Sequence, residues 1–297
     1  MTNPRVSIVV RTKNRPDFLA RALSSITAQS FDDWEAIIVN DGGDAAQVAA
    51  LVAGLSRSAD RERIRVIDHA ESRGRWVSAN AGVLAATGDY LVLHDDDDSW
   101  HSDFLARSVE YLDTHADRQG VVSRIEIVWE REENGRFVVD EREEFQAQLT
   151  APLLTDTLLF NRFVPIGFLY RRSLHAEIGL YDDRLPVVGD WDFNLKVLSR
   201  GPLEYLGDQP LAYWHQRRGA SGNAANSVAG ARSDHAKYDA SIREEALRDW
   251  VGDNGTGLVL YLTKFIDQRF VDVENGIRAE IVASSFWRRA LRRLRRR

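Results

Sequence analysis

Residues Tyr90–Trp100 read YLVLHDDDDSW, so that four aspartates directly follow a run of apolar residues. Four adjacent carboxylates repel one another, and a chain places such a run either on a solvated loop or where cations neutralise it. The apolar residues predict a buried strand that ends at the aspartates. The segments around this strand decide between the two possibilities.

Strands and helices alternate ahead of the quoted stretch. Strands are expected at Val6–Val10, Trp34–Asp44 and Ile64–His69, and helices within 11–29, near Gln47–Leu55 and at 77–88. This alternation indicates a parallel sheet, in which ligands bind at the carboxyl ends of the strands. We therefore expect the residues that follow the strands to surround one crevice; they are Arg11–Arg15, Asp41 and Asp95–Asp98.

The pattern changes in the second half of the chain. The elements expected there are a hairpin of 120–130 and 135–140, a strand and short helix in 166–182, a helix at 189–201, two short strands in 203–216 and helices from Ser233 onward. A loop rich in Gly, Ala, Ser and Asn, 217–232, precedes those last helices.

Composition and charge exclude several classes of protein. The 297 residues are 44% hydrophobic and include no cysteine, which excludes disulfides, thiolate metal sites and cysteine nucleophiles. Seven arginines lie in the last ten residues, and without them the formal charge changes from −6 to −13. An acidic body with a basic end argues against a nucleic-acid-binding protein.

The location of the protein is inferred from two absent patterns. No apolar run approaches the roughly 18–20 residues that span a bilayer. The N-terminus, MTNPRVSIVV, lacks the pattern of a signal peptide. We therefore expect a cytoplasmic protein.

Four segments, in this order, resemble the inverting family 2 glycosyltransferases of the GT-A fold. They are VSIVVRTKNRPDFLARALSSITAQSFDDWEAIIVNDGGD, SANAGVLAATGDYLVLHDDDDSW, GDWDFNLKVLSRG and YWHQRRGASGN. The resemblance implies an α/β fold with a Rossmann-like, mostly parallel sheet flanked by helices. We expect a nucleotide-sugar-binding half at 1–110, a half with the acceptor site and catalytic base at 111–232, and a C-terminal helical extension at 233–297.

The resemblance also implies a reaction. A metal-dependent enzyme would move a sugar from a nucleoside diphosphate, expected to be UDP, to a hydroxyl of a polysaccharide or lipid-linked glycan by a single displacement. A non-catalytic relative that binds sugar nucleotides or glycans would not need a base, so Asp97 and Asp190 together argue against it. A metal-dependent nucleotide phosphohydrolase, which would use water in place of an acceptor, is the other alternative.

Residues at the ends of the first two strands are candidates for binding the nucleotide. By the resemblance, Asp41 accepts a hydrogen bond from the base, although aspartate before Gly42-Gly43 also suits a plain turn. Thr12, Asn14 and Arg15 would line the same pocket, while Asn14 also suits a helix cap.

The aspartate run matches the family's metal motif as Asp95-x-Asp97-Asp98. The resemblance implies that Asp97 is the main ligand of Mn²⁺ or Mg²⁺, which prefer oxygen ligands, and that Asp95 approaches the metal or the ribose. Asp96 would lie beside the nucleotide, and Asp98 and His94 would support the ligands from behind. Because the four residues are identical, an alignment with the motif that is shifted by one position is the alternative.

Asp190 matches the family's catalytic base, which takes the proton of the acceptor hydroxyl. Asp192 is the rival, and two residues apart on a helix the pair point about 200° apart, so only one can face the cleft. Either carboxylate could instead stabilise the N-terminus of a helix. By the resemblance, His215, Arg217 and Arg218 follow the last strand on a lid over the diphosphate, and a solvated basic loop is the alternative.

Two departures from the family's pattern concern the site. The family's Ala-Arg-Asn triplet reads Ser78-Ala79-Asn80 here, so Arg73 or Arg75 would supply the charge at the phosphates. The family's glutamate before the base is replaced by Gly189, so an auxiliary acidic group is missing or has moved.

The C-terminal segment SSFWRRALRRLRRR forms a basic amphipathic pattern. Trp287, Ala290, Leu291 and Leu294 would share one face of a helix whose other faces carry arginine. Helices of this kind lie on anionic membranes, so we expect contact with the inner face of the plasma membrane. A disordered tail or a helix that binds a partner protein is the alternative.

Deleting the residues after Ser284 should abolish co-sedimentation of the protein with anionic liposomes. The deletion removes Trp287 and all seven arginines of the last ten residues, and with them the attraction to anionic lipid. Liposomes of neutral lipid serve as the control. Binding that persists after the deletion contradicts the assignment.

Overall fold

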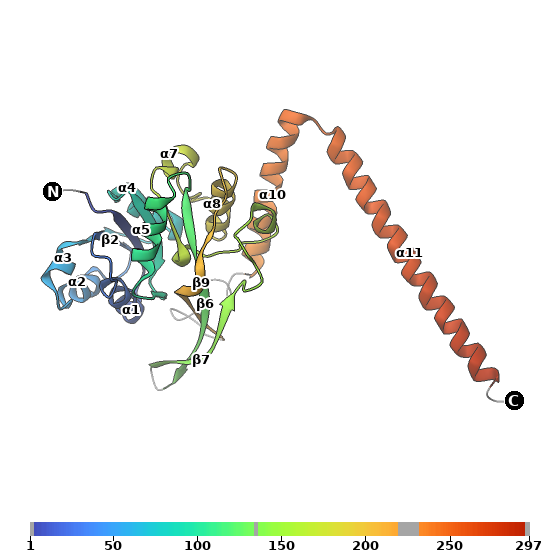
Figure 1. Cartoon of the computed structure of the whole chain (residues 1–297), viewed down its shortest axis with the longest axis horizontal. Helices are drawn as coiled ribbons and strands as arrows, with labels where there is room; N and C mark the ends of the chain where they lie inside the picture. The colour runs from blue at the N-terminus through green and yellow to red at the C-terminus, as the bar shows by residue number, and fades with distance from the viewer. Residues whose placement is uncertain (1–2, 134–135, 219–231, 295–297) are drawn as a thin grey trace. The chain divides into compact units, whose positions relative to one another are not determined.

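The computed structural model describes residues 3–133, 136–218 and 232–294, and side chains at 232 and beyond 281 lie outside this description. The chain divides into two compact units, Met1–Asp239 and Ala240–Arg297, and each is described by itself. Nine strands of the described residues form one sheet in the first unit (Figure 1).

The N-terminal half of the sheet is parallel and contains the four expected strands. They are β1 (Val6–Thr12), β2 (Trp34–Asp41), β3 (Ile64–His69) and β4 (Tyr90–Asp95), in the spatial order β3-β2-β1-β4. Arg11 pairs in register with Asp95, and Asp41 is the last residue of β2. Because parallel strands end at one edge, these three polar residues reach the same edge of the sheet.

Helices connect the strands and flank the sheet (Figure 1). They are α1 (Pro16–Thr27), α2 (Ala45–Ala53), α3 (Ser58–Glu62), α4 (Arg75–Ala85) and α5 (Phe104–Thr114). α4 lies so close to β1 that a Cβ atom at Gly82 would come within 2.2 Å of Val9 Cγ1. This approach holds the start of α4 near the end of β1, where Arg11 donates a hydrogen bond to the carbonyl of Arg75 (3.4 Å).

The rest of the sheet mixes parallel and antiparallel pairs, in the order β4-β8-β6-β9-β5 with β7 beside β6. Its strands are β5 (Ser99–Trp100), β6 (Gly120–Glu133), β7 (Arg136–Phe145), β8 (Phe168–Arg171) and β9 (Tyr205–Arg217). Its short helices are α6 (Leu154–Thr157), η1 (Pro165–Gly167), α7 (Leu174–Ile178) and α8 (Gly189–Leu198). The expected hairpin and the expected α/β class are confirmed.

One expectation about the second half is wrong. The segment 203–216, predicted as two short strands, instead contains the single strand β9 from Tyr205 onward, whose register against β6 is irregular near its start. β9 continues through Arg217 because β6 runs beside it and places Glu130 opposite Arg217. His215 and Arg217 therefore lie inside a strand, not on the loop expected to follow it.

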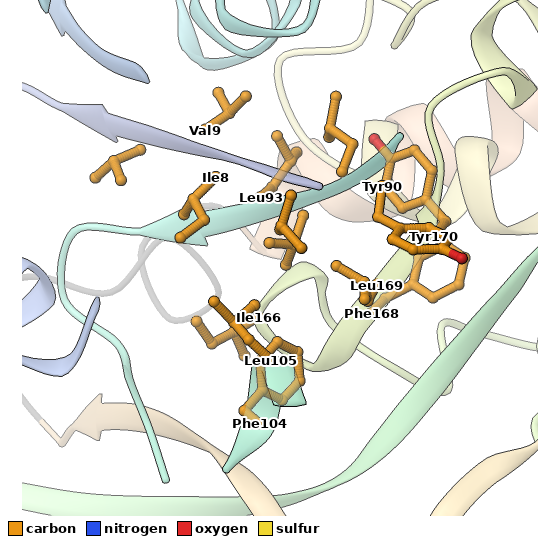
Figure 2. Close-up of a cluster of buried hydrophobic side chains, with 14 of the residues drawn as sticks. Ile8, Val9, Tyr90, Leu93, Phe104, Leu105, Ile166, Phe168, Leu169 and Tyr170 are labelled. Carbon is orange, nitrogen blue, oxygen red and sulfur yellow. The ribbon is translucent and has the colours of Figure 1, made fainter. Parts of the chain in front are cut away.

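A shared hydrophobic core joins the two halves of the sheet. Figure 2 shows part of it, in which Ile8, Val9, Tyr90 and Leu93 of β1 and β4 lie near Phe104, Leu105, Ile166, Phe168, Leu169 and Tyr170. Each of these side chains is at most 3% exposed. Burying one such side chain stabilises a fold by about 1.5–3 kcal/mol, so the cluster fixes the strand ends relative to one another.

The C-terminal residues are helical, as expected. α10 covers Arg232–Asn254, and α11 covers Gly257–Leu294. Among the described residues, no helix is both long enough and apolar enough to cross a membrane.

Candidate active site

The four aspartates at the end of β4 lie in the wall of a pocket and not on a solvated loop. Asp96, Asp97 and Asp98 are only 3%, 9% and 2% exposed. All four aspartates line a pocket of about 450 Å³, which Thr12, Asp41 and Asp190 also line. Carboxylates buried at this density need compensating positive charge.

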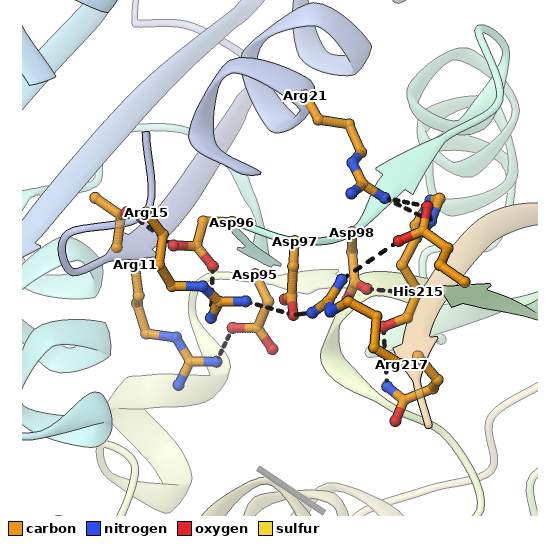
Figure 3. A network of polar contacts seen from close by, with 12 residues as sticks. Arg11, Arg15, Arg21, Asp95, Asp96, Asp97, Asp98, His215 and Arg217 are labelled. Carbon is orange, nitrogen blue, oxygen red and sulfur yellow. Dashed lines mark hydrogen bonds and ion pairs between the residues drawn. The ribbon is translucent and has the colours of Figure 1, made fainter. Parts of the chain in front are cut away.

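Three arginines from separate elements supply that charge (Figure 3). Arg11 comes from β1, Arg15 precedes α1, and Arg217 ends β9. The ion pairs are Arg11–Asp95, Arg15–Asp96 (3.1 Å), Arg15–Asp97 (2.6 Å) and Arg217–Asp97. Asp97 is therefore held from both sides, by the start of α1 and by the end of β9.

Burial shifts two of the four carboxyl groups toward the neutral form. It raises the pKa of Asp96 to about 7, although Arg15 opposes the shift and Thr12 Oγ1 donates a hydrogen bond of 2.7 Å. Burial and the neighbouring carboxylates also raise the pKa of Asp98, whose Oδ1 accepts the backbone N–H of His215 (2.9 Å). At neutral pH the run therefore carries fewer than four negative charges.

A buried polar network supports Arg217 from behind. Glu130 of β6 accepts a hydrogen bond from Arg21 (2.8 Å) and pairs with Arg217 (3.4 Å), and its Oε1 contacts His215 Nδ1 (2.9 Å). His215 Nε2 contacts Ser99 Oγ (2.8 Å). His215 and Arg217 thus stabilise the site from within β9, with Arg217 bridging Glu130 and the aspartate run.

Asp41 organises the loop between β3 and α4. Its carboxylate accepts the backbone N–H groups of Arg73 (2.8 Å) and Gly74 (3.0 Å) and the hydroxyl of Ser72 (2.7 Å). His69 Nδ1 lies 3.1 Å away. Burial works against ionisation, but these hydrogen bonds hold the pKa of Asp41 well below its usual value.

The other expected nucleotide-binding residues separate into two groups. Thr12, Arg15 and Arg75 line the pocket. Arg73 provides its backbone N–H to Asp41, and Asn14 accepts the backbone N–H of the residue that caps α2 (3.0 Å). The side chains of Arg73 and Asn14 are not part of the pocket wall.

Asp190 lies at the start of α8 and lines the same pocket as the aspartate run. Its Oδ2 accepts a hydrogen bond from Asn161 Nδ2 (2.8 Å). Burial raises its pKa above the usual value. Asp192, the rival base, instead pairs with Lys196 (2.6 Å) and does not line the pocket. The geometry therefore separates the two carboxylates in the way that the helical spacing predicts.

The backbone before Asp190 is unusual. Val188 has φ +57°, a left-handed conformation that is rare for a β-branched residue and is strained. At Gly189, a Cβ atom would lie 2.6 Å from the ring of Trp76, which in turn lies beneath the guanidinium of Arg11 (4.9 Å). A glutamate side chain at 189 would collide with Trp76, which explains why glycine is found there.

The remaining expected residues lie outside the pocket wall. His94 is fully buried behind the run, with Nδ1 2.8 Å from the carbonyl of Asp95, and burial lowers its pKa to about 4. Arg218 is exposed and pairs with Glu141 (2.9 Å). The segment 219–231, which contains most of the expected lid, lies outside the described residues.

A sequence model of glycosyl transferase family 2 matches residues 7–179, which contain β1 and the aspartate run. The chain belongs to glycosyl transferase family 2. The resemblance noted in the sequence is confirmed, and the protein is a glycosyltransferase.

Two relatives show how far this family 2 glycosyltransferase resembles curated proteins. YwdF of Bacillus subtilis, an uncharacterized glycosyltransferase, is 37% identical over 198 residues, which are 65% of this chain and 68% of YwdF. A PGL/p-HBAD biosynthesis glycosyltransferase of Mycobacterium bovis is 30% identical over 205 residues, which are 68% of this chain and 73% of that relative.

Solved structures of Staphylococcus aureus TarS share the fold of this glycosyltransferase. One matches with a TM-score of 0.54 and 21% identity over 71% of this chain, but over only 36% of TarS. The fragment 1–349 in complex with UDP-GlcNAc matches with a TM-score of 0.55 and 19% identity, over 73% of this chain and 60% of the fragment. These matches confirm the GT-A fold.

The expected metal ligands of the glycosyltransferase, Asp95 and Asp97, can be tested for whether they suit a divalent cation. Among the residues described, no group of three or more His, Asp or Glu side chains is arranged to hold a metal ion. A hard cation that also binds substrate phosphates needs only one or two carboxylates from the protein. Asp95 and Asp97 line the pocket and offer such oxygens, so they fit a cation of this kind, with Arg15 and Arg217 as competitors for Asp97.

The wild-type protein should lose stability as the pH rises from 3.8 to about 7, and the Asp96→Asn variant should lose less. Between the usual aspartate pKa of 3.8 and about 7, folded Asp96 holds a proton that the unfolded chain lacks. The free energy of unfolding therefore falls as the pH rises through this window, by up to about 1.4 kcal/mol for each pH unit. Urea unfolding at several pH values between these limits measures the slope.

The matched control is Asp183→Asn, because Asp183 is exposed. This variant should keep the slope of the wild type. An equal slope in Asp96→Asn and the wild type would contradict the raised pKa of Asp96.

Proposed function

We propose that this family 2 glycosyltransferase moves a sugar from a UDP-linked donor to a hydroxyl of a polysaccharide or lipid-linked glycan. The transfer would be a metal-dependent single displacement that inverts the anomeric carbon. One observation carries the proposal: a single pocket is lined by Asp41, by the run Asp95–Asp98 and by Asp190, which come from distant parts of the sequence.

The pocket suits a nucleoside diphosphate. Arg11, Lys13, Arg15 and Arg75 line it, and cationic side chains bind phosphate oxygens through charge-assisted hydrogen bonds. UDP is favoured because TarS, which shares the fold, has been crystallised with UDP and with UDP-GlcNAc. Asp41 lies at the end of β2 and lines the same pocket, where its carboxylate would meet the base.

Mn²⁺ or Mg²⁺ would be held by Asp97 and Asp95 together with the diphosphate of the donor. A bound divalent cation would neutralise negative charge on the leaving group. Arg15 and Arg217 already bring positive charge to Asp97. Neutralisation by these arginines alone is therefore the competing account.

Asp190 would act as the general base. The acceptor oxygen forms a bond to the anomeric carbon, the bond from that carbon to the diphosphate oxygen breaks, and UDP leaves with the bonding electrons. The hydroxyl proton passes to the Asp190 carboxylate. Burial raises the pKa of Asp190, which makes its carboxylate a stronger base, and Asn161 orients it through the 2.8 Å hydrogen bond.

An apolar edge beside Asp190 favours an acceptor with an apolar part. Leu153, Leu158, Leu159 and Phe160 are between 46% and 63% exposed. The next residue, Asn161, donates to Asp190. A cluster of exposed apolar side chains commonly marks a binding surface. A lipid-linked glycan would place its sugar at Asp190 and its lipid along this edge.

Contact of the C-terminal tail with an anionic membrane fits the same class of acceptor. A lipid-linked glycan is held at a membrane, and the seven arginines of the last ten residues would bring the enzyme to it. Side chains beyond 281 lie outside the described residues, so the sequence pattern alone supports this contact.

UDP should bind more tightly in the presence of Mn²⁺, and replacing Asp97 by Asn should weaken that binding at least tenfold. The substitution removes a charged ligand of the proposed cation. Calorimetric titration of UDP, GDP and dTDP, with Mn²⁺ and with EDTA, measures both effects. Asp183→Asn, which changes an exposed aspartate outside the pocket wall, is the control.

Each outcome of the titration separates the parts of the proposal. Equal UDP affinity with Mn²⁺ and with EDTA would contradict the metal site and favour neutralisation by Arg15 and Arg217. Tighter binding of GDP or dTDP would contradict the UDP donor. Binding of none of the three nucleotides would contradict the donor site as a whole.

Replacing Asp190 by Asn should lower kcat by about 10²–10⁴-fold, which is the usual contribution of a general base. Replacing Asp192 by Asn should change kcat only a few-fold, because Asp192 pairs with Lys196 outside the pocket. In the wild type, kcat should fall as pH drops through the raised pKa of Asp190. UDP release from a panel of UDP-sugars, with octyl and methyl glycosides as acceptors, provides the assay.

Product analysis completes this test. A product with the anomeric configuration opposite to that of the donor supports a single displacement, and retention would contradict it. Release of free sugar with no glycoside product would favour the hydrolase alternative. A larger decrease of kcat in Asp192→Asn than in Asp190→Asn would exchange the roles of the two carboxylates.

A further inference from the structure

An apolar stripe runs along α11. Its residues recur at spacings of three, four and four, and they are Val259, Leu262, Ile266, Phe270, Val273, Ile277 and Ile281. This spacing is an 11-residue repeat, or about 3.67 residues per turn, which stays on one face of a nearly straight helix. Helices that pack against other helices along their whole length show repeats of this kind.

The stripe is solvent-exposed. From Leu262 to Ile281 its side chains are between 43% and 72% exposed, with Phe270 the most exposed. Figure 1 shows α11 as one long continuous helix. Large apolar side chains in a continuous row of this length normally lie against another surface.

Charges on the same part of α11 favour protein over membrane as that surface. Residues 257–281 contain three basic and four acidic side chains. Pairs such as Arg278–Glu274 (2.6 Å) and Lys264–Asp267 (3.3 Å) link them along the helix. A helix that lies on an anionic membrane has a polar face rich in Lys and Arg, and this segment has a balanced one.

We propose that the glycosyltransferase self-associates, with the stripe of α11 packed against the same stripe of a second copy of the chain. The inference does not depend on the proposed donor or acceptor. Burying the exposed stripe residues would remove on the order of 600 Å² of apolar surface from each helix, close to the ~800 Å² per partner of a stable interface of standard size. An 11-residue repeat gives such a pair a slight right-handed supercoil.

On this proposal the stripe pairs two chains, and the basic tail contacts the membrane. The stripe ends at Ile281, and the seven arginines begin at Arg288. A pair of chains would carry two such tails, and two weak contacts with a membrane hold more firmly than one. Deleting the residues after Ser284 leaves the stripe intact, so self-association should survive that deletion.

Light scattering after size exclusion, without lipid or detergent, tests the pairing on the 297-residue chain. The mass expected for the wild type is at least twice the 33.6 kDa of one chain. The double variant Phe270→Glu with Ile277→Glu should have the mass of one chain, because it places like charges in the stripe. The matched control, Leu260→Glu with Val271→Glu, changes exposed apolar residues off the stripe and should keep the wild-type mass.

Three outcomes would overturn the proposal. They are a single-chain mass for the wild type at every protein concentration, a wild-type mass for the stripe variant, and an equal loss of mass in the control variant. Circular dichroism of each variant checks that its helix content is retained.

Cysteine cross-linking gives an independent test, because the chain has no native cysteine. Single cysteines are placed at Leu262, Phe270 and Ile277 on the stripe and at Val271 off it, and the proteins are oxidised. Parallel pairing should give disulfide-linked dimers at all three stripe positions. Antiparallel pairing, with the two stripes overlapping along their whole length, should give them at Phe270, the midpoint of the stripe. Either result supports the proposal. Cross-linking at none of the three, or as strongly at Val271, would overturn it.

Discussion

Charge compensation at the end of β4 is the constraint on which the site depends. Four consecutive carboxylates lie in a pocket wall, and Arg11, Arg15 and Arg217 reach them from β1, from the start of α1 and from β9. Removing one partner of a buried ion pair costs on the order of 3–5 kcal/mol, because the other charge is left uncompensated. These pairs therefore fix the ends of three strands around one pocket.

The same pairs bear on how the proposed reaction begins. A cation bound at Asp97 would compete with Arg15 and Arg217 for the same carboxylate. A diphosphate that arrives with the cation offers those guanidinium groups new anionic partners, to which arginine binds well. On the proposed function, donor binding would thus exchange ion pairs and leave no charge unpaired. Glu130, which contacts Arg217 at 3.4 Å, would keep this contact during the exchange.

Strand boundaries in the parallel half were predictable, because buried β-branched runs there are bounded by turn residues. β3 covers Ile64–His69 as expected, and the residues that follow β1, β2 and β4 reach one edge of the sheet. β9 was predicted wrongly because its length depends on pairing with β6, which no local pattern records. Glu130, Asn161 and Trp76 were missed for a similar reason, since their neighbouring residues carry no motif.

The sequence by itself determined the fold family, the aspartate run at a strand end and the helical spacing that lets only one of Asp190 and Asp192 face a cleft. These features are local, because each depends on residues within one or two elements. Only the tertiary structure decided which arginine pairs with which aspartate. Arg217 and Asp97 are 120 positions apart, and they meet because the register of β9 on β6 brings them together. Such a contact depends on the packing of the whole sheet, which residue spacing along the chain does not specify.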